Sequence, residues 1–144
     1  MSAEPRLPSA NVRFLTLASL RWVLRHRAYT PWYLVRYLRF ARMLAANRGA
    51  VIVRGMVFLD RGAVVSARAG YARLIIGKWV YVGAGSALRC HEGTMIVGDR
   101  TTFARDVCVN TYLDLEIGAC GLIADDVYIS DFDHQFTRHD LPIK

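Results

Sequence analysis

The chain has 144 residues, of which 53% are hydrophobic and 22% charged, a composition that excludes an intrinsically disordered protein. Its formal charge of +7 is unevenly placed: residues 1–50 carry nine arginines and one acid, whereas residues 51–144 carry ten Lys or Arg and eleven Asp or Glu. The longest early apolar stretch, residues 14–20, is far shorter than the ~20 residues that span a bilayer, and no secretory signal is visible. We therefore expect a cytoplasmic protein whose basic N-terminal third has a task of its own.

The N-terminal third has the pattern of two amphipathic helices. Apolar residues recur at three- and four-residue steps from residue 11 to 27, which predicts a first helix. Thr30 followed by Pro31 is typical of a helix start, and Gly49 of a helix end, so a second helix is predicted over residues 31–47. The apolar positions expected on this second helix include Tyr33 or Leu34, Leu38, Ala41 and Ala45.

Two roles fit these helices. Arginines next to Trp22 and Trp32 would suit contact with an anionic membrane surface through residues 11–48, which would make the protein membrane-peripheral. Alternatively, the apolar faces pack on the domain or on oligomer neighbours, while arginines such as Arg36 and Arg39 face water. Charge alone would also attract nucleic acid, but no base-reading motif is present, so we expect no nucleic-acid partner.

From residue 51 onward the sequence has a six-residue repeat. Bulky apolar residues occupy every sixth position in triplets, and insertions of five, three and two residues separate successive triplets. Gly or Ala directly follows half of these stepped residues, and small or aliphatic residues usually stand two positions before the next step. The stepped residues are Val53, Leu59 and Val65, then Ile76, Val82 and Leu88, then Val97, Phe103 and Val109, and finally Ile117, Ile123 and Ile129.

This periodicity predicts a parallel β-helix of about four coils. Each hexad forms a short strand and a bend, and three hexads close one triangular coil whose stepped residues point inward. These residues would stack on their equivalents roughly 4.8 Å above and below, and only stacking buries the apolar row. We therefore predict an all-β domain over residues 51–144, with insertions bulging from one corner and a terminal loop, preceded by the basic helical segment 1–50.

The regular repeat ends at a histidine that could act as a general base. His134 stands five residues after the stepped Ile129, and the same offset from Val109 reaches Asp114, so the two would be stacked neighbours. A neutral imidazole can take the proton of a hydroxyl as that hydroxyl attacks a thioester. The ring would need a carboxylate to orient it. Asp114, Asp131 and Asp133 are all candidates, and the sequence does not choose among them.

The hexads and this terminal segment resemble the hexapeptide-repeat acetyltransferases of the maltose, galactoside and colanic-acid type. The resemblance covers residues 53–144 and implies a left-handed β-helix, a homotrimer, and acetyl-CoA as the acyl donor co-substrate. It implies that His134 is the general base acting on a hydroxyl of a sugar or glycan acceptor. The segment 109–114 resembles the acceptor-side segment of these enzymes, which implies acceptor contacts for Asn110 and Asp114.

Two alternatives remain at this point. Members of those families continue with further coils that hold much of the donor, whereas this sequence ends ten residues after His134. The chain would then be a truncated, non-catalytic β-helix scaffold or a fragment. The γ-class carbonic anhydrases share the fold and bind zinc through three histidines, but His139 lies past the last hexad and His91 follows Leu88 in a turn. These histidines do not converge in register, so we expect no metal site.

Overall fold

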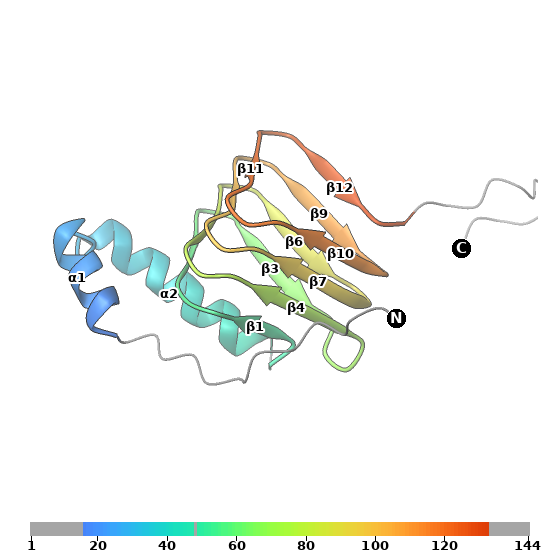
Figure 1. Ribbon diagram of the computed structural model, residues 1–144, viewed down its shortest axis with the longest axis horizontal. Helices are drawn as coiled ribbons and strands as arrows, with labels where there is room; N and C mark the ends of the chain where they lie inside the picture. The colour runs from blue at the N-terminus through green and yellow to red at the C-terminus, as the bar shows by residue number, and fades with distance from the viewer. Residues whose placement is uncertain (1–15, 48, 133–144) are drawn as a thin grey trace, which may run out of the picture.

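The computed structural model describes residues 16–47 and 49–132 (Figure 1). Two helices, α1 (Leu17–Arg25) and α2 (Pro31–Ala46), precede twelve short strands. The strands are β1 (Val51–Val53), β2 (Val57–Leu59), β3 (Val64–Ala67), β4 (Ala72–Ile76), β5 (Val80–Val82), β6 (Ala87–Cys90), β7 (Gly93–Val97), β8 (Thr102–Phe103), β9 (Cys108–Thr111), β10 (Asp114–Ile117), β11 (Leu122–Ile123) and β12 (Tyr128–Ser130).

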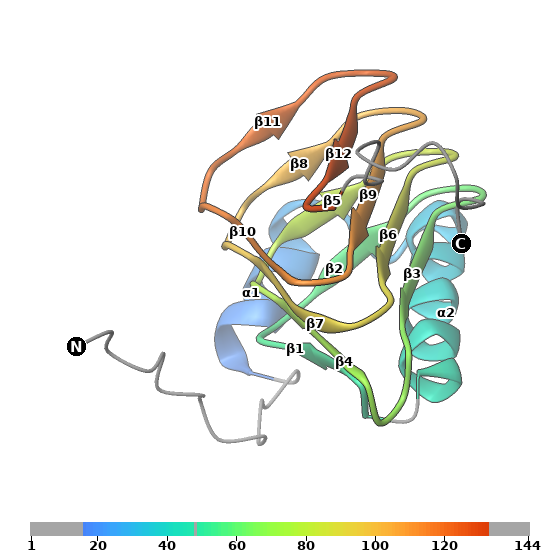
Figure 2. The same cartoon turned by 90° about the vertical axis from the view of Figure 1, so that its right-hand side faces the viewer.

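The strands form a three-sided solenoid of about four coils, which confirms the predicted architecture. Three parallel sheets have the orders β1-β4-β7-β10, β2-β5-β8-β11 and β3-β6-β9-β12, so each coil contributes one strand to every side (Figure 2). We call these sides sheets A, B and C. The handedness of the winding stays a prediction from the resemblance.

The stepped apolar residues stack in the predicted register along the solenoid axis. In sheet B, Leu59 pairs with Val82, Val82 with Phe103, and Phe103 with Ile123. The equivalent rows of sheets A and C are also in register. Side chains of this ladder are buried in the first three coils and partly buried in the fourth. The inner core is therefore a stack of aliphatic rungs, as the six-residue repeat predicts.

Corner glycines are required by the close approach of neighbouring coils. A Cβ atom added to Gly77 would collide with Asp99 of the next coil, and one added to Gly98 would collide with the backbone at Ala119. The glycines after Ile76 and Val97 therefore leave room for the adjacent coil.

All three insertions fall at the corner where sheet C is followed by sheet A. They lie between β3 and β4, between β6 and β7, and between β9 and β10. The other two corners turn with the regular hexad spacing. The solenoid therefore has one irregular corner, and the segment leading to His134 leaves the last coil from the same corner.

Both predicted helices are present, with their start signals partly confirmed. Helix α1 begins with a reciprocal cap in which the Ser19 amide donates to the Thr16 hydroxyl and the Thr16 amide donates to the Ser19 hydroxyl. Helix α2 begins at Pro31 as predicted, but the Thr30 side chain makes no capping hydrogen bond. Neither helix has the length and hydropathy that crossing a bilayer requires.

Helix α2 closes the open end of the solenoid below the first coil. Phe40 and Met43 are buried and belong to the same core cluster as the inward rungs. At the end of the helix, the buried Asn47 amide donates to the Val65 carbonyl at 3.0 Å and its side-chain oxygen accepts from the Ala67 amide at 3.0 Å. Asn47 thus supplies the hydrogen bonds that a further strand would supply to β3, and it covers an exposed sheet edge.

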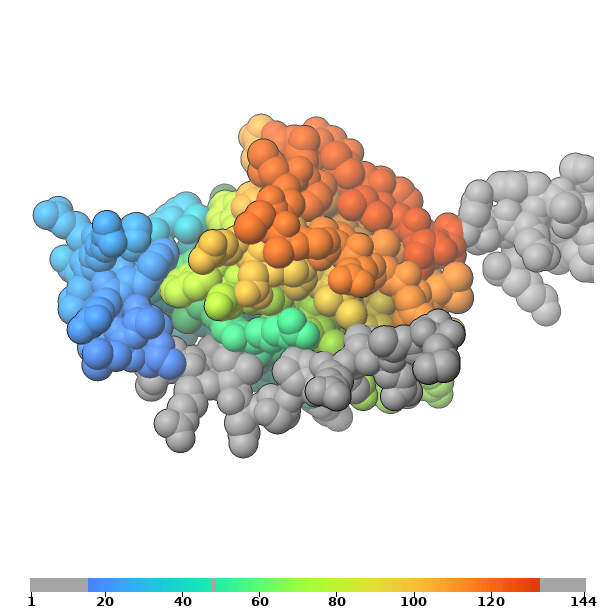
Figure 3. Space-filling view, viewed as in Figure 1, coloured from blue at the N-terminus to red at the C-terminus, as the bar shows by residue number. Residues whose placement is uncertain are grey.

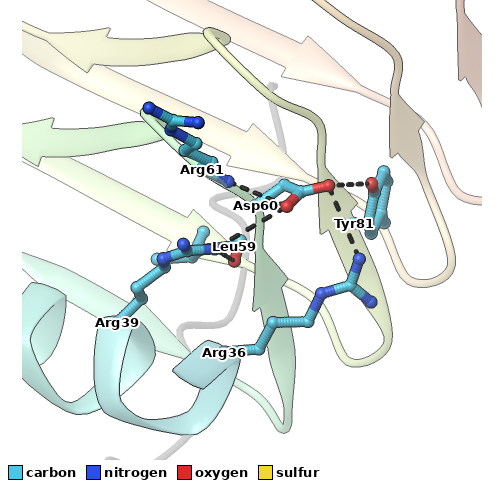
Figure 4. A network of polar contacts seen from close by, with 6 residues as sticks. All are labelled: Arg36, Arg39, Leu59, Asp60, Arg61 and Tyr81. Atoms are coloured by element: carbon cyan, nitrogen blue, oxygen red, sulfur yellow. Dashed lines mark hydrogen bonds and ion pairs between the residues drawn. The ribbon is translucent and has the colours of Figure 1, made fainter. Parts of the chain in front are cut away.

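A polar network around Asp60 fixes α2 to the solenoid (Figure 4). The Asp60 carboxylate accepts a hydrogen bond from the Tyr81 hydroxyl at 2.8 Å and forms ion pairs with Arg36 at 3.5 Å and Arg39 at 3.6 Å. Partial burial raises the pKa of Asp60, but the hydrogen bonds from Tyr81 and from the Arg61 amide, with the two arginine charges, outweigh burial and lower its net pKa. The expectation that the arginines of this helix face water is therefore wrong for Arg36 and Arg39, whereas Arg42 is exposed as expected.

Most of the predicted apolar positions of α2 lie on its outer side, whereas Tyr33 is half-buried with its ring 6.2 Å from that of Phe58. Leu34 and Leu38 are exposed, as are Ala41 and Ala45, whereas the face that contacts the solenoid carries Phe40 and the other residues already described. The face of α2 that packs on the solenoid therefore carries both polar and apolar side chains. Its contacts are the Asp60 network and the open end of the first coil. The aliphatic face of the helix is left without a partner among the described residues.

Candidate functional site

The irregular corner carries a stack of aromatic side chains in successive coils. His91, Tyr112 and Phe132 occupy the same place after β6, β9 and β12. The His91 and Tyr112 rings are stacked with centroids 4.6 Å apart, and the Tyr112 and Phe132 rings meet edge-on at 4.4 Å. We call this feature the corner stack. It packs the corner from His91 to Phe132, two residues before His134 in the sequence.

The Asp131 carboxylate binds the backbone of the turn between β9 and β10. One of its carboxylate oxygens accepts a hydrogen bond from the Tyr112 amide at 2.8 Å, and the other accepts one from the Leu113 amide at 2.9 Å. Asp131 therefore orders the turn between β9 and β10, where Asp114 begins the next strand. Its predicted contact with the His134 ring lies outside the described residues.

Asp114 is exposed at the start of β10, where it is the register partner of Thr94 in β7. No hydrogen bond or ion pair engages its carboxylate among the described residues, so the group is free to meet a ligand. Asn110 lies in β9 on sheet C, where its amide is 3.3 Å from the Cys108 sulfur and 3.5 Å from the Tyr128 hydroxyl. No hydrogen bond joins Asn110 to Asp114 in the described part of the chain.

His134 and Asp133 lie outside the described residues. The register on which their predicted placement depends is confirmed, because Ile129 pairs with Val109 and Ser130 with Asn110. The same count of five residues from this pair relates position 134 to Asp114. The stacking of His134 on Asp114 therefore stays a prediction.

The interior of the corner contains a buried thiol, that of Cys90, whose pKa is raised. Cys90 is 2% exposed, and its sulfur lies 3.4 Å from the Glu92 carbonyl and 3.5 Å from that of Arg73. Burial raises the pKa of the Cys90 thiol, and the nearby carboxylates of Asp131 and Asp114 raise it further. A thiol that is protonated and enclosed is a core residue and a poor nucleophile.

A hollow of about 580 Å³ opens at the same corner, one coil below Asp114. It is lined in part by Tyr71 from the first insertion, by Arg73 in β4, and by Gly93 and Thr94 at the start of β7. Asp114 and Arg73 are both register partners of Thr94. The hollow and the Asp114 carboxylate therefore lie at the same end of sheet A, where its strands begin. Sequence reasoning missed Tyr71 and Arg73, although the five-residue insertion was the signal that could have pointed to them.

A second cavity of about 290 Å³ lies far from this corner, between α1 and the turns after β1 and β4. Trp22 and Trp79 contribute to its walls, with ring centroids 4.8 Å apart. None of the predicted site residues lines it.

The described residues hold no cluster of three or more His, Cys, Asp or Glu side chains that could bind a metal ion. His91 is occupied in the corner stack, and His134 and His139 lie outside residues 16–132. The described part of this corner offers the unpaired carboxylate of Asp114 at the start of β10.

Comparison with known proteins points to acyl transfer. No family model matches the chain, and no solved structure matches it. The chain is similar to a protein of Mycobacterium tuberculosis named "Probable acetyltransferase Rv3034c", with 53% identity over 132 residues, which is 92% of this chain and 44% of that protein. The chain thus spans less than half the length of the curated relative it matches. This similarity and the four-coil solenoid are together consistent with a hexapeptide-repeat acetyltransferase.

Proposed function

We propose that this chain belongs to an acyltransferase that moves an acetyl or similar acyl group from acyl-CoA to a hydroxyl of a sugar or glycan. The observation that carries the proposal is the confirmed register of the fourth coil, which relates His134 to the free carboxylate of Asp114. The similarity to a protein named as a probable acetyltransferase supports acyl transfer in general. The acceptor class comes from the resemblance of the hexads and the terminal segment.

In the proposed reaction, neutral His134 removes the proton of the acceptor hydroxyl while the hydroxyl oxygen attacks the thioester carbonyl. The new C–O bond forms, the C–S bond breaks, and the sulfur leaves as the CoA thiolate. The histidine returns its proton to this thiolate, so the products are the ester and free CoA.

We assign the acceptor side to the edge of sheet A. The free carboxylate of Asp114 would accept a hydrogen bond from a second acceptor hydroxyl, and the hollow lined by Tyr71 and Arg73 would accommodate the rest of a glycan. Asn110 would contact the acceptor from sheet C. Asp131 would act as a positioning residue through the turn that it orders, and Asp131 or Asp133 would orient the His134 ring.

Acetyl-CoA is the expected donor, bound as a co-substrate. We assign no donor contact to a described residue, because the chain corresponds to 44% of the relative that it resembles. We also propose a homotrimer and a cytoplasmic location, with a membrane-peripheral position.

The decisive experiment measures CoA release by the full-length protein with acetyl-CoA and a panel of sugar and glycan acceptors. His134→Ala should lower kcat by about 10²–10⁴-fold, the range typical of a lost general base. Asp114→Asn should raise KM for the acceptor more than it lowers kcat. His26→Gln is the matched control, because His26 is exposed at the end of α1, remote from the site corner.

Undiminished turnover by His134→Ala would remove the proposed base and with it this mechanism. Calorimetric titration with CoA separates the enzyme from the scaffold alternative. A full-length protein that binds neither CoA nor acetyl-CoA would support a non-catalytic β-helix.

A further inference from the structure

We propose that the outer faces of α1 and α2 form a docking surface for an anionic lipid bilayer. This surface, the helical face, consists of Leu17, Leu20 and Leu24 on α1 with Leu34, Val35 and Leu38 on α2. Its side chains are strongly exposed, with 68% of Leu17, 62% of Leu24 and 65% of Leu38 open to solvent. Apolar side chains gathered in this way on a surface mark an interaction site.

The orientation of α1 separates its aliphatic and aromatic residues. With about 100° of rotation per residue, Leu17, Leu20 and Leu24 fall within an arc of about 60°, and Arg21 and Arg25 lie directly beside it. Trp22 is on the other side, where its ring packs at a tilt against those of Trp79 and Phe58, with centroids 4.8 Å and 5.5 Å away. Helix α1 is therefore held to the solenoid by its aromatic side and presents leucines flanked by arginines.

Helix α2 repeats this arrangement. Its inner side carries Phe40 and Asn47, which contact the first coil, and its outer side carries Leu34 and Leu38. Arg42 is the charged residue on the same outer side. Figure 3 shows α1 (blue) at the left of the molecule and the last coil (orange-red) at its top and right, so α1 lies apart from the last coil.

The charge of the helices selects the kind of partner. Residues 16–47 contain six arginines and no Asp or Glu. Arg36 and Arg39 share the single carboxylate of Asp60. The other four arginines are exposed and make no ion pair within the described residues; they are Arg21, Arg25, Arg27 and Arg42. Unpaired arginines next to exposed leucines suit a bilayer, where leucines enter the acyl boundary and guanidinium groups meet anionic headgroups.

A second copy of the chain fits this face less well. In a two-fold contact each residue meets the same surface on its partner, so the unpaired arginines would face one another. Like charges brought together in this way oppose association. Anionic lipid instead provides the opposite charge along the whole face, and the inference holds whether or not the solenoid transfers acyl groups.

The test is co-sedimentation of the full-length protein with vesicles. We use phosphatidylcholine vesicles and vesicles of phosphatidylcholine mixed with phosphatidylglycerol, and we expect binding to the second kind only. Binding should weaken in high salt, since the Debye length falls to about 3 Å at 1 M. Because each basic residue near an anionic surface accounts for about fivefold in binding, Arg21→Glu with Arg25→Glu should weaken it roughly 25-fold or more.

The control double variant, Arg100→Glu with Arg105→Glu, makes the same charge change on exposed residues of the solenoid and should leave binding nearly unchanged. A second test variant, Leu20→Ser with Leu24→Ser, should abolish binding while circular dichroism shows an intact fold. Equal binding to both vesicle types, or equal losses in the test and control arginine variants, would overturn the proposal. So would a lipid-independent oligomer that the leucine variant dissociates, because the face would then be a protein interface.

Discussion

Truncation of Phe103 is the most direct perturbation of the solenoid core. Phe103 is the largest fully buried side chain and sits in the sheet B row between Val82 and Ile123. Replacing a buried phenylalanine with alanine removes the transfer free energy of the ring and leaves a cavity, which together cost about 3–5 kcal/mol. Rungs above and below are held in register by their own strands, so the coil has little freedom to collapse into the gap.

We would measure this by urea denaturation followed by circular dichroism at 25 °C. With a slope of about 2 kcal/mol per M, the Phe103→Ala midpoint should fall by roughly 1.5–2.5 M. Leu122→Ala is the matched control, because Leu122 neighbours the same row in β11 but is 78% exposed, and its cost should stay within about 0.5 kcal/mol. Equal midpoints for the two variants would refute the inward ladder and the register that locates the site.

Further predictions concern the Asp60 network, a corner glycine and the thiols. Asp60→Asn should cost about 1–3 kcal/mol at neutral pH. Because the folded pKa of Asp60 lies below its ordinary value of 3.8, the wild type should lose this advantage as pH falls through that lower pKa, and pH titration of stability should show the two proteins converging. Gly98→Ala should destabilise by about 1–3 kcal/mol in thermal unfolding, since overpacking forces neighbouring backbone to shift. Ellman's reagent should modify exposed Cys120 at once and buried Cys90 only after unfolding; rapid labelling of Cys90 would contradict its enclosure.

The solenoid could be predicted from the sequence because its determinant is local and repeated. Every sixth residue must be apolar to fill a three-sided prism, and Gly77 and Gly98 must be small to let coils approach. The insertion lengths alone also located the irregular corner. This pattern can be recognised in a single sequence, because each coil requires the same residue types at the same positions.

The candidate site was predictable only in part. Counting from Ile129 and Val109 gave the correct register for the fourth coil, and so the offset that relates His134 to Asp114. The double backbone cap by Asp131 and the hollow lined by Arg73 depend on residues 18 or more positions apart that meet at one corner. No pattern among neighbouring residues of the sequence predicts such long-range contacts.

The sequence by itself determined the coil number, the register and the two helices, because periodicity acts through neighbouring residues. Only the tertiary structure decided which side of α2 faces the solenoid. Helical spacing favoured the aliphatic stripe with Leu34 and Leu38, but the open first coil offered Asp60 and the unpaired edge of β3, which Arg36 and Asn47 satisfy. Leaving those polar groups unpaired in a partly buried place costs more than exposing leucines does, so the polar contacts set the orientation and left the leucines outside.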